Sequence, residues 1–351
     1  MKFPEVVSVE QADQYEQVID VRSPAEFALD HYPGAINCPV LDNEERIVVG
    51  TLYKQVSVFE AKKVGAALVA RNIAKHLDEQ FSKNPKEWTP LIYCWRGGNR
   101  SGAMTHILRQ VGWRASQLDG GYKAFRRQVI NELEILPGRF QWRVLSGETG
   151  SAKSRVLEGL AAAGAQVLDL EALACHKGSV LGILPDQPQP AQKMFETRIW
   201  DVLRKLDPAR PVFVEAESKK VGQLRVPEHL FEQMTQHSTV FRIQASVAAR
   251  VDFLIEDYHY FLADTDTLKQ QLRHLVTLHG HEVIHHWCQQ VDAAQWPELV
   301  GDLLVRHYDP AYLKSSNNLF TGFATAHPLP ADKLDGPGIA RLVDQLLDLQ
   351  G

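Results

Sequence analysis

The chain has 351 residues, 44% hydrophobic and 23% charged, a composition typical of a globular protein and a length that favours two domains. Its formal net charge of −5 argues against a uniformly basic nucleic-acid-binding protein. No apolar run approaches the length of a membrane span, and the first residues lack a secretory pattern. The four cysteines are far apart, which favours neither disulfides nor a cysteine-based zinc site. We therefore expect a cytoplasmic protein without a membrane partner.

The first polar residues of interest end a short apolar stretch near the N-terminus. Residues 18–22 predict a buried strand that ends in Asp20 and Arg22, and Ser23 and Glu26 are spaced as the caps of a following helix. A charged pair at this position is typical of a catalytic site or of a pair that fixes loops by hydrogen bonds. We favour the second interpretation.

The most reactive stretch joins a predicted strand at 91–93 to a predicted helix at 103–111 that ends at Gly112. The intervening loop contains Cys94, Trp95, Arg96, Gly97, Gly98, Asn99 and Arg100. In a strand–loop–helix unit, the loop N–H groups and the helix N-terminus converge on one spot, which binds anions and lowers the pKa of a thiol. We therefore predict that Cys94 is a thiolate nucleophile and that Arg100 closes the cradle over a charged ligand. The alternative is a buried structural cysteine.

Basic residues are concentrated around this loop. Residues 94–143 contain nine Lys or Arg residues but only three acids. Such an excess is typical of a surface that follows a phosphate backbone, or of a solvated face beside one anion pocket. Composition leaves both interpretations open.

A Pro-Gly pair at residues 137–138 indicates a boundary between domains at 1–136 and 139–351. The second domain begins with a predicted strand at 142–145 and a loop typical of phosphate-binding loops, which contains Gly147, Thr149, Gly150, Ser151, Ala152, Lys153 and Ser154. The loop N–H groups would wrap a diphosphate, Lys153 would meet its charge, and Ser154 is placed for Mg²⁺. Ala152 replaces the usual second glycine, and we expect its methyl group to narrow the loop and disfavour ordinary nucleotide binding.

Further candidate contacts follow along the second domain. Glu215 ends a second predicted strand and is a candidate Mg²⁺ ligand with Ser154, or a plain structural hydrogen-bond acceptor. Polar residues in nearby loops are candidate substrate contacts, namely Lys177, Ser179, Gln192 and Lys219. From residue 248 onward, the spacing of Leu and Val predicts helices.

One pattern in this helical part is misleading. Residues 281–285 match the H-E-x-x-H zinc pattern, but His274, His279 and His286 show that histidine is frequent here. A zinc hydrolase also needs a third ligand and a cleft. We expect no certain metal site in these residues.

The N-terminal motifs resemble a rhodanese domain over about the first 135 residues. They are residues 19–27, His31, residues 33–37, the Cys94 loop and residues 118–121. The resemblance implies a small doubly wound α/β unit whose loop cysteine carries sulfur as a persulfide. Here five residues separate Cys94 from Arg100, where common sulfurtransferases have four. This spacing resembles the C-x5-R loop of cysteine phosphatases and predicts a cradle for a tetrahedral phosphate-like anion.

Taken together, the two loops and residues 177–179, 189–192 and 215–222 resemble the tRNA 2-selenouridine synthases. The resemblance implies a rhodanese-like doubly wound parallel sheet followed by a P-loop α/β domain with extra helices. It implies a transferase that acts on wobble 2-thiouridine in the anticodon arm of tRNA, and that replaces sulfur by selenium from selenophosphate after S-geranylation by geranyl diphosphate. It also implies no tightly bound cofactor, and a protein that supplies selenophosphate as a candidate partner.

Two other functions use the same motifs. A persulfide sulfurtransferase coupled to a nucleotide-binding P-loop domain would need both Cys94 and Lys153. A non-enzymatic docking module would need neither, which the intact Cys94 loop disfavours. Within the favoured function, the sequence leaves open whether Cys94 carries selenium covalently or only positions its donor.

Overall fold

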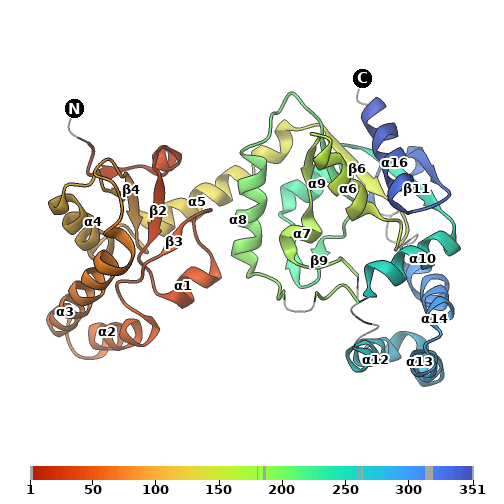
Figure 1. Cartoon of the computed structure of the whole chain (residues 1–351), viewed down its shortest axis with the longest axis horizontal. Coiled ribbons are helices and arrows are strands. Elements are labelled where there is room, and N and C mark those ends of the chain that lie inside the picture. Colours follow the sequence, from red (N-terminus) through yellow and green to blue (C-terminus); the bar gives the residue numbers. More distant parts are fainter. Residues whose placement is uncertain are drawn as a thin grey trace. The chain divides into compact units, whose positions relative to one another are not determined.

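A computed structural model of the chain describes residues 3–179, 181–184, 187–259, 261, 264–312 and 319–349 (Figure 1). They form two compact units, one up to Glu132 together with Glu196–Asp201, and the other comprising Leu133–Phe195 and the chain from Val202 onward. Each unit contains one five-stranded sheet whose strand pairs are all parallel. The predicted mixed α/β class is therefore confirmed.

The first unit has the sheet order β1-β5-β4-β2-β3. Its elements are β1 (Val6–Val7), η1 (Val9–Gln14), β2 (Gln17–Asp20), α1 (Pro24–Leu29), β3 (Ile36–Asn37), α2 (Asn43–Gln55), α3 (Val58–His76), η2 (Leu77–Phe81), β4 (Pro90–Tyr93), α4 (Asn99–Val111), β5 (Ser116–Leu118) and α5 (Gly121–Leu133). The predicted caps of α1 form, since Ser23 and Glu26 make a capping box. Helix α4 ends at Gly112 as predicted, with that glycine in the left-handed conformation.

Both faces of the first sheet are covered. On one face, Ile92 and Cys94 pack in a core cluster with Ile73 of α3 and Met104 of α4. Tyr93 points to the opposite face, because side chains alternate along a strand. There the Arg22 guanidinium lies 5.6 Å from the Tyr93 ring centre and 4.0 Å from that of Tyr122 on α5. Helices on both faces are what the doubly wound prediction requires.

The second unit has the sheet order β12-β11-β6-β8-β7, with a separate β9–β10 hairpin. Its described elements are η3 (Leu136–Arg139), β6 (Trp142–Ser146), α6 (Lys153–Ala162), β7 (Gln166–Leu168), α7 (Leu170–Ala174), the two ends of α8 (Gln192–Leu203), β8 (Val212–Glu215), β9 (Lys220–Val221), β10 (Leu224–Arg225), α9 (Glu228–Gln236), β11 (Ser238–Ala245), α10 (Val247–Asp257), α12 (Thr265–Arg273), α13 (Val276–Asp292), α14 (Trp296–Leu303), η4 (Leu304–Tyr308), η5 (Phe323–Thr325), β12 (His327–Ala331) and α16 (Gly336–Asp348). The middle of α8, Glu196–Asp201, belongs to the first unit.

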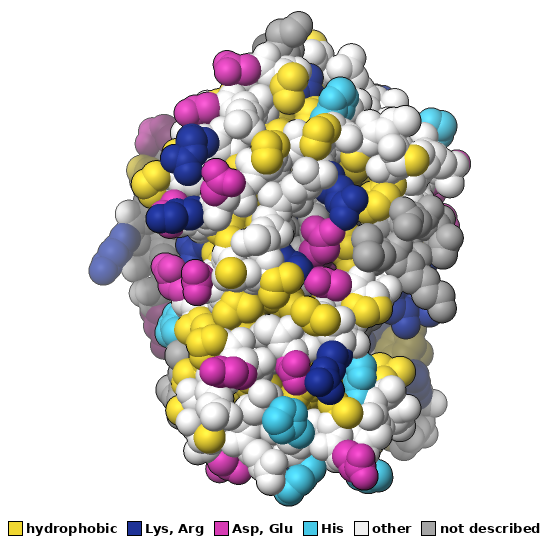
Figure 2. Space-filling view, turned by 90° about the vertical axis from the view of Figure 1, so that its right-hand side faces the viewer, with side chains coloured by type: hydrophobic (Ala, Val, Ile, Leu, Met, Phe, Trp, Pro, Cys, Tyr) yellow, Lys and Arg dark blue, Asp and Glu magenta, His cyan; other side chains and the backbone are white. Residues whose placement is uncertain are grey.

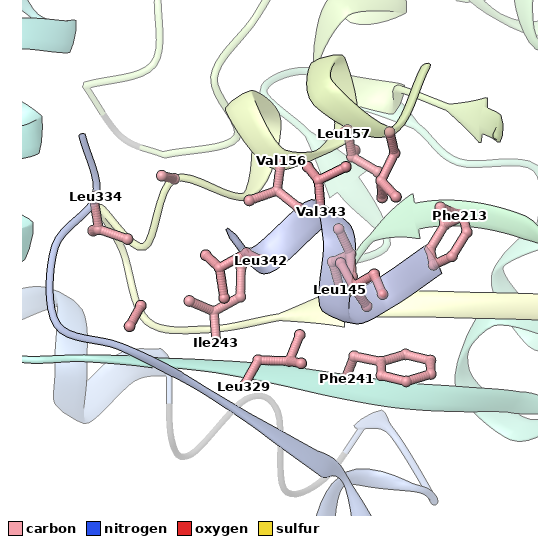
Figure 3. Close-up of a cluster of buried hydrophobic side chains, with 14 residues drawn as sticks. Leu145, Val156, Leu157, Phe213, Phe241, Ile243, Leu329, Leu334, Leu342 and Val343 are labelled. Atoms are coloured by element: carbon pink, nitrogen blue, oxygen red, sulfur yellow. The ribbon is translucent and has the colours of Figure 1, made fainter. Parts of the chain in front are cut away.

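Helices α6 and α16 cover one face of the second sheet. Val156 and Leu157 of α6 meet Leu342 and Val343 of α16 above the strands (Figure 3). These side chains are almost fully buried, and burying each stabilises the fold by about 1.5–3 kcal/mol. The core fixes the start of α6, and so fixes the loop that precedes it.

The helical prediction for the C-terminal part is wrong at β12. This segment contains Pro328 and Pro330, yet it pairs in parallel with β11 at the edge of the sheet. An edge strand tolerates proline because one side of it needs no N–H donor. Helices α12, α13 and α14 share a separate apolar cluster around Trp287 and Leu272, against which Tyr258 at the C-cap of α10 also packs. Among the residues described, no helix is both long and apolar enough to cross a membrane.

Candidate functional site

The first site is the loop between β4 and α4. The Cys94 side chain is buried, and its sulfur accepts hydrogen bonds from the Gly98 N–H at 3.3 Å and the Ser101 hydroxyl at 3.2 Å. Gln117 in turn donates to the Ser101 oxygen at 2.8 Å. The Ser101 hydroxyl also lies 3.3 Å from the Gly98 carbonyl oxygen, and the bond from Gln117 holds the Ser101 oxygen in place beside the sulfur. Ser101 was missed from the sequence, although it stands directly after the Cys-x5-Arg pattern.

These donors change the acidity of the thiol. Burial alone raises the pKa of Cys94, because it disfavours the charged form. The Ser101 hydroxyl and the N–H groups of Ser101, Arg96 and Gly98 outweigh burial, so the net effect is a lowered pKa. The contrast is Cys38, whose burial lacks such donors and raises its pKa to about 12. The geometry therefore favours a thiolate at Cys94 and a protonated thiol at Cys38.

The loop keeps its shape because two glycines lie against each other. Gly97 and Gly121 both have positive φ, at 63° and 55°. A β-carbon on Gly121 would lie 2.3 Å from the Cys94 carbonyl oxygen and 2.5 Å from the Gly97 nitrogen. The Tyr122 N–H also donates to the Cys94 carbonyl at 2.8 Å. The start of α5 therefore packs against the loop backbone and stabilises its conformation.

Other predicted residues of this site have structural partners. Arg100 pairs with Glu26 at 3.1 Å, and the Trp95 ring stacks on Tyr122 with centres 5.2 Å apart. Arg96, Gly98 and Asn99 are exposed. Asp20 and Arg22 form a buried ion pair at 2.6 Å, and Arg22 also donates to the Asp30 carbonyl at 2.6 Å. This pair fixes loops, as the sequence interpretation favoured.

The second site is the loop between β6 and α6. The first N–H groups of α6 face this loop, and Lys153 donates to the Gly147 carbonyl at 2.9 Å. The loop is held from outside, where Tyr312 accepts from the Gly147 N–H at 2.7 Å. Buried Arg250 donates to the Thr149 carbonyl at 3.2 Å and pairs with Asp309. Backbone donors, a lysine and a hydroxyl thus gather where a diphosphate would bind.

Ala152 does not narrow the loop as expected. It adopts a left-handed conformation with φ 59° and ψ 26°, which glycine usually occupies. Its side chain is 3% exposed and belongs to the core cluster between the second sheet and helices α6 and α16. The methyl group is therefore part of the core, and the argument against nucleotide binding from a narrowed loop fails.

Carboxyl groups line one side of this loop. Ser154 donates to Glu171 at 2.7 Å, and the Glu171 N–H donates to Glu215 at 2.8 Å. Burial is the main cause that raises the pKa of Glu215 and Glu217 well above the usual range, and neighbouring carboxylates add to it. A raised pKa favours the uncharged form of these two carboxyls, which lessens their repulsion of an anion in the loop. The acid beside Ser154 is Glu171, which the sequence interpretation missed, although it follows strand β7 by three residues.

These contacts bear on the expected Mg²⁺ ligands. Glu215 is 1% exposed and holds the start of α7, which supports its interpretation as a structural acceptor. The described residues contain no group of three or more His, Cys, Asp or Glu side chains arranged to hold a metal ion. His281 and His285 of the zinc-like pattern are exposed on α13.

A cleft of about 620 Å³ opens over the phosphate-binding loop. Lys177 and Ser179 line it, and Lys177 also pairs with Asp257 at 2.5 Å. Gln192 and Lys219 are not among its lining residues. Gln192 instead bonds both backbone groups of Arg225, and Lys219 pairs with Glu228. The structure thus brings two of these four predicted contacts to the cleft.

Comparison with known proteins follows the same division of the chain. A model described as "Rhodanese-like domain" matches residues 5–128, and a model described as "tRNA 2-selenouridine synthase AAA domain" matches residues 140–275. The fold and sites therefore define a rhodanese-like domain joined to a P-loop domain.

Curated relatives share both parts. Each is named tRNA 2-selenouridine synthase. The protein from Nitrosomonas europaea is 36% identical over 69% of this chain and 63% of its own length, just under two thirds. Those from Alcanivorax borkumensis and Shewanella denitrificans are 33% and 30% identical, over 84% and 85% of this chain and 88% of their own. The chain belongs to the tRNA 2-selenouridine synthase family.

The hydrogen bonds to Cys94 predict its reactivity. We expect the iodoacetamide reaction of Cys94 to reach half its maximal rate at a pH below the pKa of about 8.5 of a free thiol, whereas Cys38 reacts only at much higher pH. Ser101→Ala removes a donor to the thiolate, so it should shift the Cys94 midpoint to higher pH. Mass spectrometry of each cysteine peptide measures both rates. Identical profiles for Cys94 and Cys38 would contradict the assignment.

The glycine contact predicts a difference between two substitutions. Gly34 has φ 75° and open space around it, so Gly34→Ala should cost about 1 kcal/mol from left-handed strain alone. Gly121→Ala adds a backbone clash and should cost more than about 2 kcal/mol. Urea unfolding monitored by circular dichroism compares the midpoints. Equal midpoints would show that the loop relaxes without strain.

Proposed function

We propose that this chain replaces sulfur by selenium in wobble 2-thiouridine of tRNA, with selenophosphate as selenium donor, and that it does so through an S-geranylated intermediate made from geranyl diphosphate. One observation carries the proposal: a member of this family contains two separate strand–loop–helix sites, one around the Cys94 thiol and one around Lys153, and each has the composition expected to bind an anion. A single sulfur transfer would need only the first loop. Two charged donors give a use for both.

The phosphate-binding loop serves the first step. The thiocarbonyl sulfur of the base attacks the first carbon of the geranyl group, the carbon–oxygen bond breaks, and its electron pair leaves with diphosphate. The N–H groups before α6 and the Lys153 ammonium stabilise that leaving charge. Alkylation matters because a thiocarbonyl sulfur is a poor leaving group, whereas an alkylated sulfur departs as geranyl thiol.

The Cys94 loop serves the second step. It holds selenophosphate through the loop N–H groups that already face the sulfur. Selenium attacks carbon 2 of the base and expels geranyl thiol, while water takes the phosphoryl group as phosphate. The products are 2-selenouridine, geranyl thiol and phosphate, so atoms and charge balance.

The surface beside Cys94 suits an RNA partner. Arg96, Lys123 and Arg127 are exposed, and the Lys123 N–H donates to the Trp95 carbonyl at 3.1 Å, which places α5 against the loop. Exposed Lys and Arg side chains bind the phosphates of a nucleic acid without recognising its base sequence. Among the side chains coloured in Figure 2, on the face over the C-terminal helices, basic and acidic residues are interspersed. The basic residues near Cys94 are the better docking surface.

Removal of the thiol separates the two steps. We expect Cys94→Ser to abolish selenation and to leave part of the geranylation, because the diphosphate site does not use Cys94. Mass spectrometry of thiolated tRNA after incubation with both donors measures both products. Cys38→Ser, in the same unit, is the control and should retain both. Equal loss of both products in Cys94→Ser would overturn the division of labour.

Removal of the lysine tests the other loop. Lys153→Ala should reduce geranylation about 100-fold, because it removes one preorganised charge at the leaving group. Lys219→Ala is the matched control, since Lys219 is 52% exposed and paired with Glu228. The readout is geranylated tRNA formed without selenophosphate. Wild-type rates in Lys153→Ala would rule out this loop as the diphosphate site, and robust ATP hydrolysis with thiosulfate-to-thiocyanate turnover would favour a coupled sulfurtransferase instead.

A further inference from the structure

A second, smaller cavity adjoins the phosphate-binding cleft in the same unit. It measures about 70 Å³ beside the 620 Å³ cleft. Both are lined by Thr149 of the phosphate-binding loop and by Leu254 and Tyr258 at the end of α10. The two spaces therefore meet at the loop itself.

The smaller cavity is almost wholly apolar. Its far wall comes from α14 and η4, including Leu299, Leu303 and Leu304, which are at most 5% exposed. Helices α10 and α14 lie side by side there (Figure 1). The polar groups sit at the junction, where the Tyr308 hydroxyl bonds Ser179 and burial raises the pKa of Tyr308 to about 12. The hydroxyl thus stays uncharged at neutral pH.

We infer that this apolar cavity seats the end of the hydrocarbon chain of a prenyl diphosphate whose diphosphate lies in the phosphate-binding loop. The inference rests on the proposed function, which names geranyl diphosphate as donor, and adds where its chain binds. A loop that binds diphosphate and opens directly onto an apolar space matches a ligand with a charged head and a hydrocarbon tail.

The size of the cavity narrows the class of ligand. The cavity measures about 70 Å³, where a single water needs about 10–15 Å³, so it admits only a small group. A ten-carbon chain would put more hydrocarbon into this apolar space than a five-carbon chain.

A nucleobase fits this space poorly. Its ring nitrogens and exocyclic groups need hydrogen-bond partners, and each unpaired buried polar group costs binding energy. The wall at α14 is formed by Trp296, Leu299, Val300 and Leu303, and the indole N–H of Trp296 is the one polar group among these four side chains. The cavity therefore selects for hydrocarbon over a nucleoside.

Calorimetry with diphosphates of different chain length tests the inference. The full-length protein is titrated with inorganic diphosphate, dimethylallyl diphosphate and geranyl diphosphate. We expect geranyl diphosphate to bind on the order of 100-fold more tightly than the five-carbon compound, with a more negative heat-capacity change, because further hydrocarbon is buried.

Two filling variants, Val300→Phe and Leu303→Phe, occupy the cavity. We expect each to weaken geranyl diphosphate at least tenfold and to leave inorganic diphosphate within threefold of wild type. Ile284→Phe adds similar bulk to the same apolar cluster but not to the cavity, and should keep the preference for ten carbons. If the filling variants do not fold, Leu299→Ala enlarges the space instead, and should improve farnesyl relative to geranyl diphosphate.

The outcomes separate this inference from the proposed function. If wild-type protein binds geranyl diphosphate no more tightly than inorganic diphosphate, the proposed donor is wrong and the tail site falls with it. If wild-type protein prefers ten carbons and the folded filling variants retain that preference unchanged, the donor stands and the tail lies elsewhere.

Discussion

Backbone N–H groups at the start of a helix are the interaction on which both sites depend. At α4 they point at the Cys94 sulfur, and at α6 they point into a cleft lined by Lys153. In each unit the helix begins directly after a central strand of a parallel sheet, so the fold itself orients the donors. Side chains then decide what each helix start does. One helix start faces a thiol with a lowered pKa, and the other carries a lysine that bonds the loop backbone.

The second site also contains acidic side chains, whose negative charge opposes the binding of an anion. Three acids lie near the loop that we expect to bind an anion, namely Glu171, Glu215 and Glu217. Such carboxylates would repel a diphosphate if all were ionised. Burial raises the pKa of Glu215 and Glu217, which favours their uncharged forms and lessens the repulsion. Glu171 accepts from Ser154 and donates its N–H to Glu215, so it connects the start of α6 to the end of β8.

The sequence predicted the local features of the sites better than the long-range contacts. The strand, loop and helix around Cys94 follow from apolar runs and glycines, and the capping pair of α1 follows from spacing. Glu171, by contrast, reaches Ser154 only through the order of the strands, because Ser154 follows β6 and Glu171 follows β7, with β8 between these two strands in the sheet. Gln192 and Lys219 are polar loop residues whose partners, Arg225 and Glu228, come from a hairpin and a helix that no local pattern connects to them. Likewise β12 was missed because its prolines are tolerated only at a sheet edge, a position that sequence spacing does not reveal.

Ala152 gives the phosphate-binding loop an unusual mechanical character. Where a glycine would let the backbone sample many shapes, an alanine anchored in the core leaves few. The loop backbone therefore has a nearly fixed conformation. A loop of nearly fixed shape would lose little conformational entropy when an anion binds, so neither binding nor release would require its backbone to rearrange.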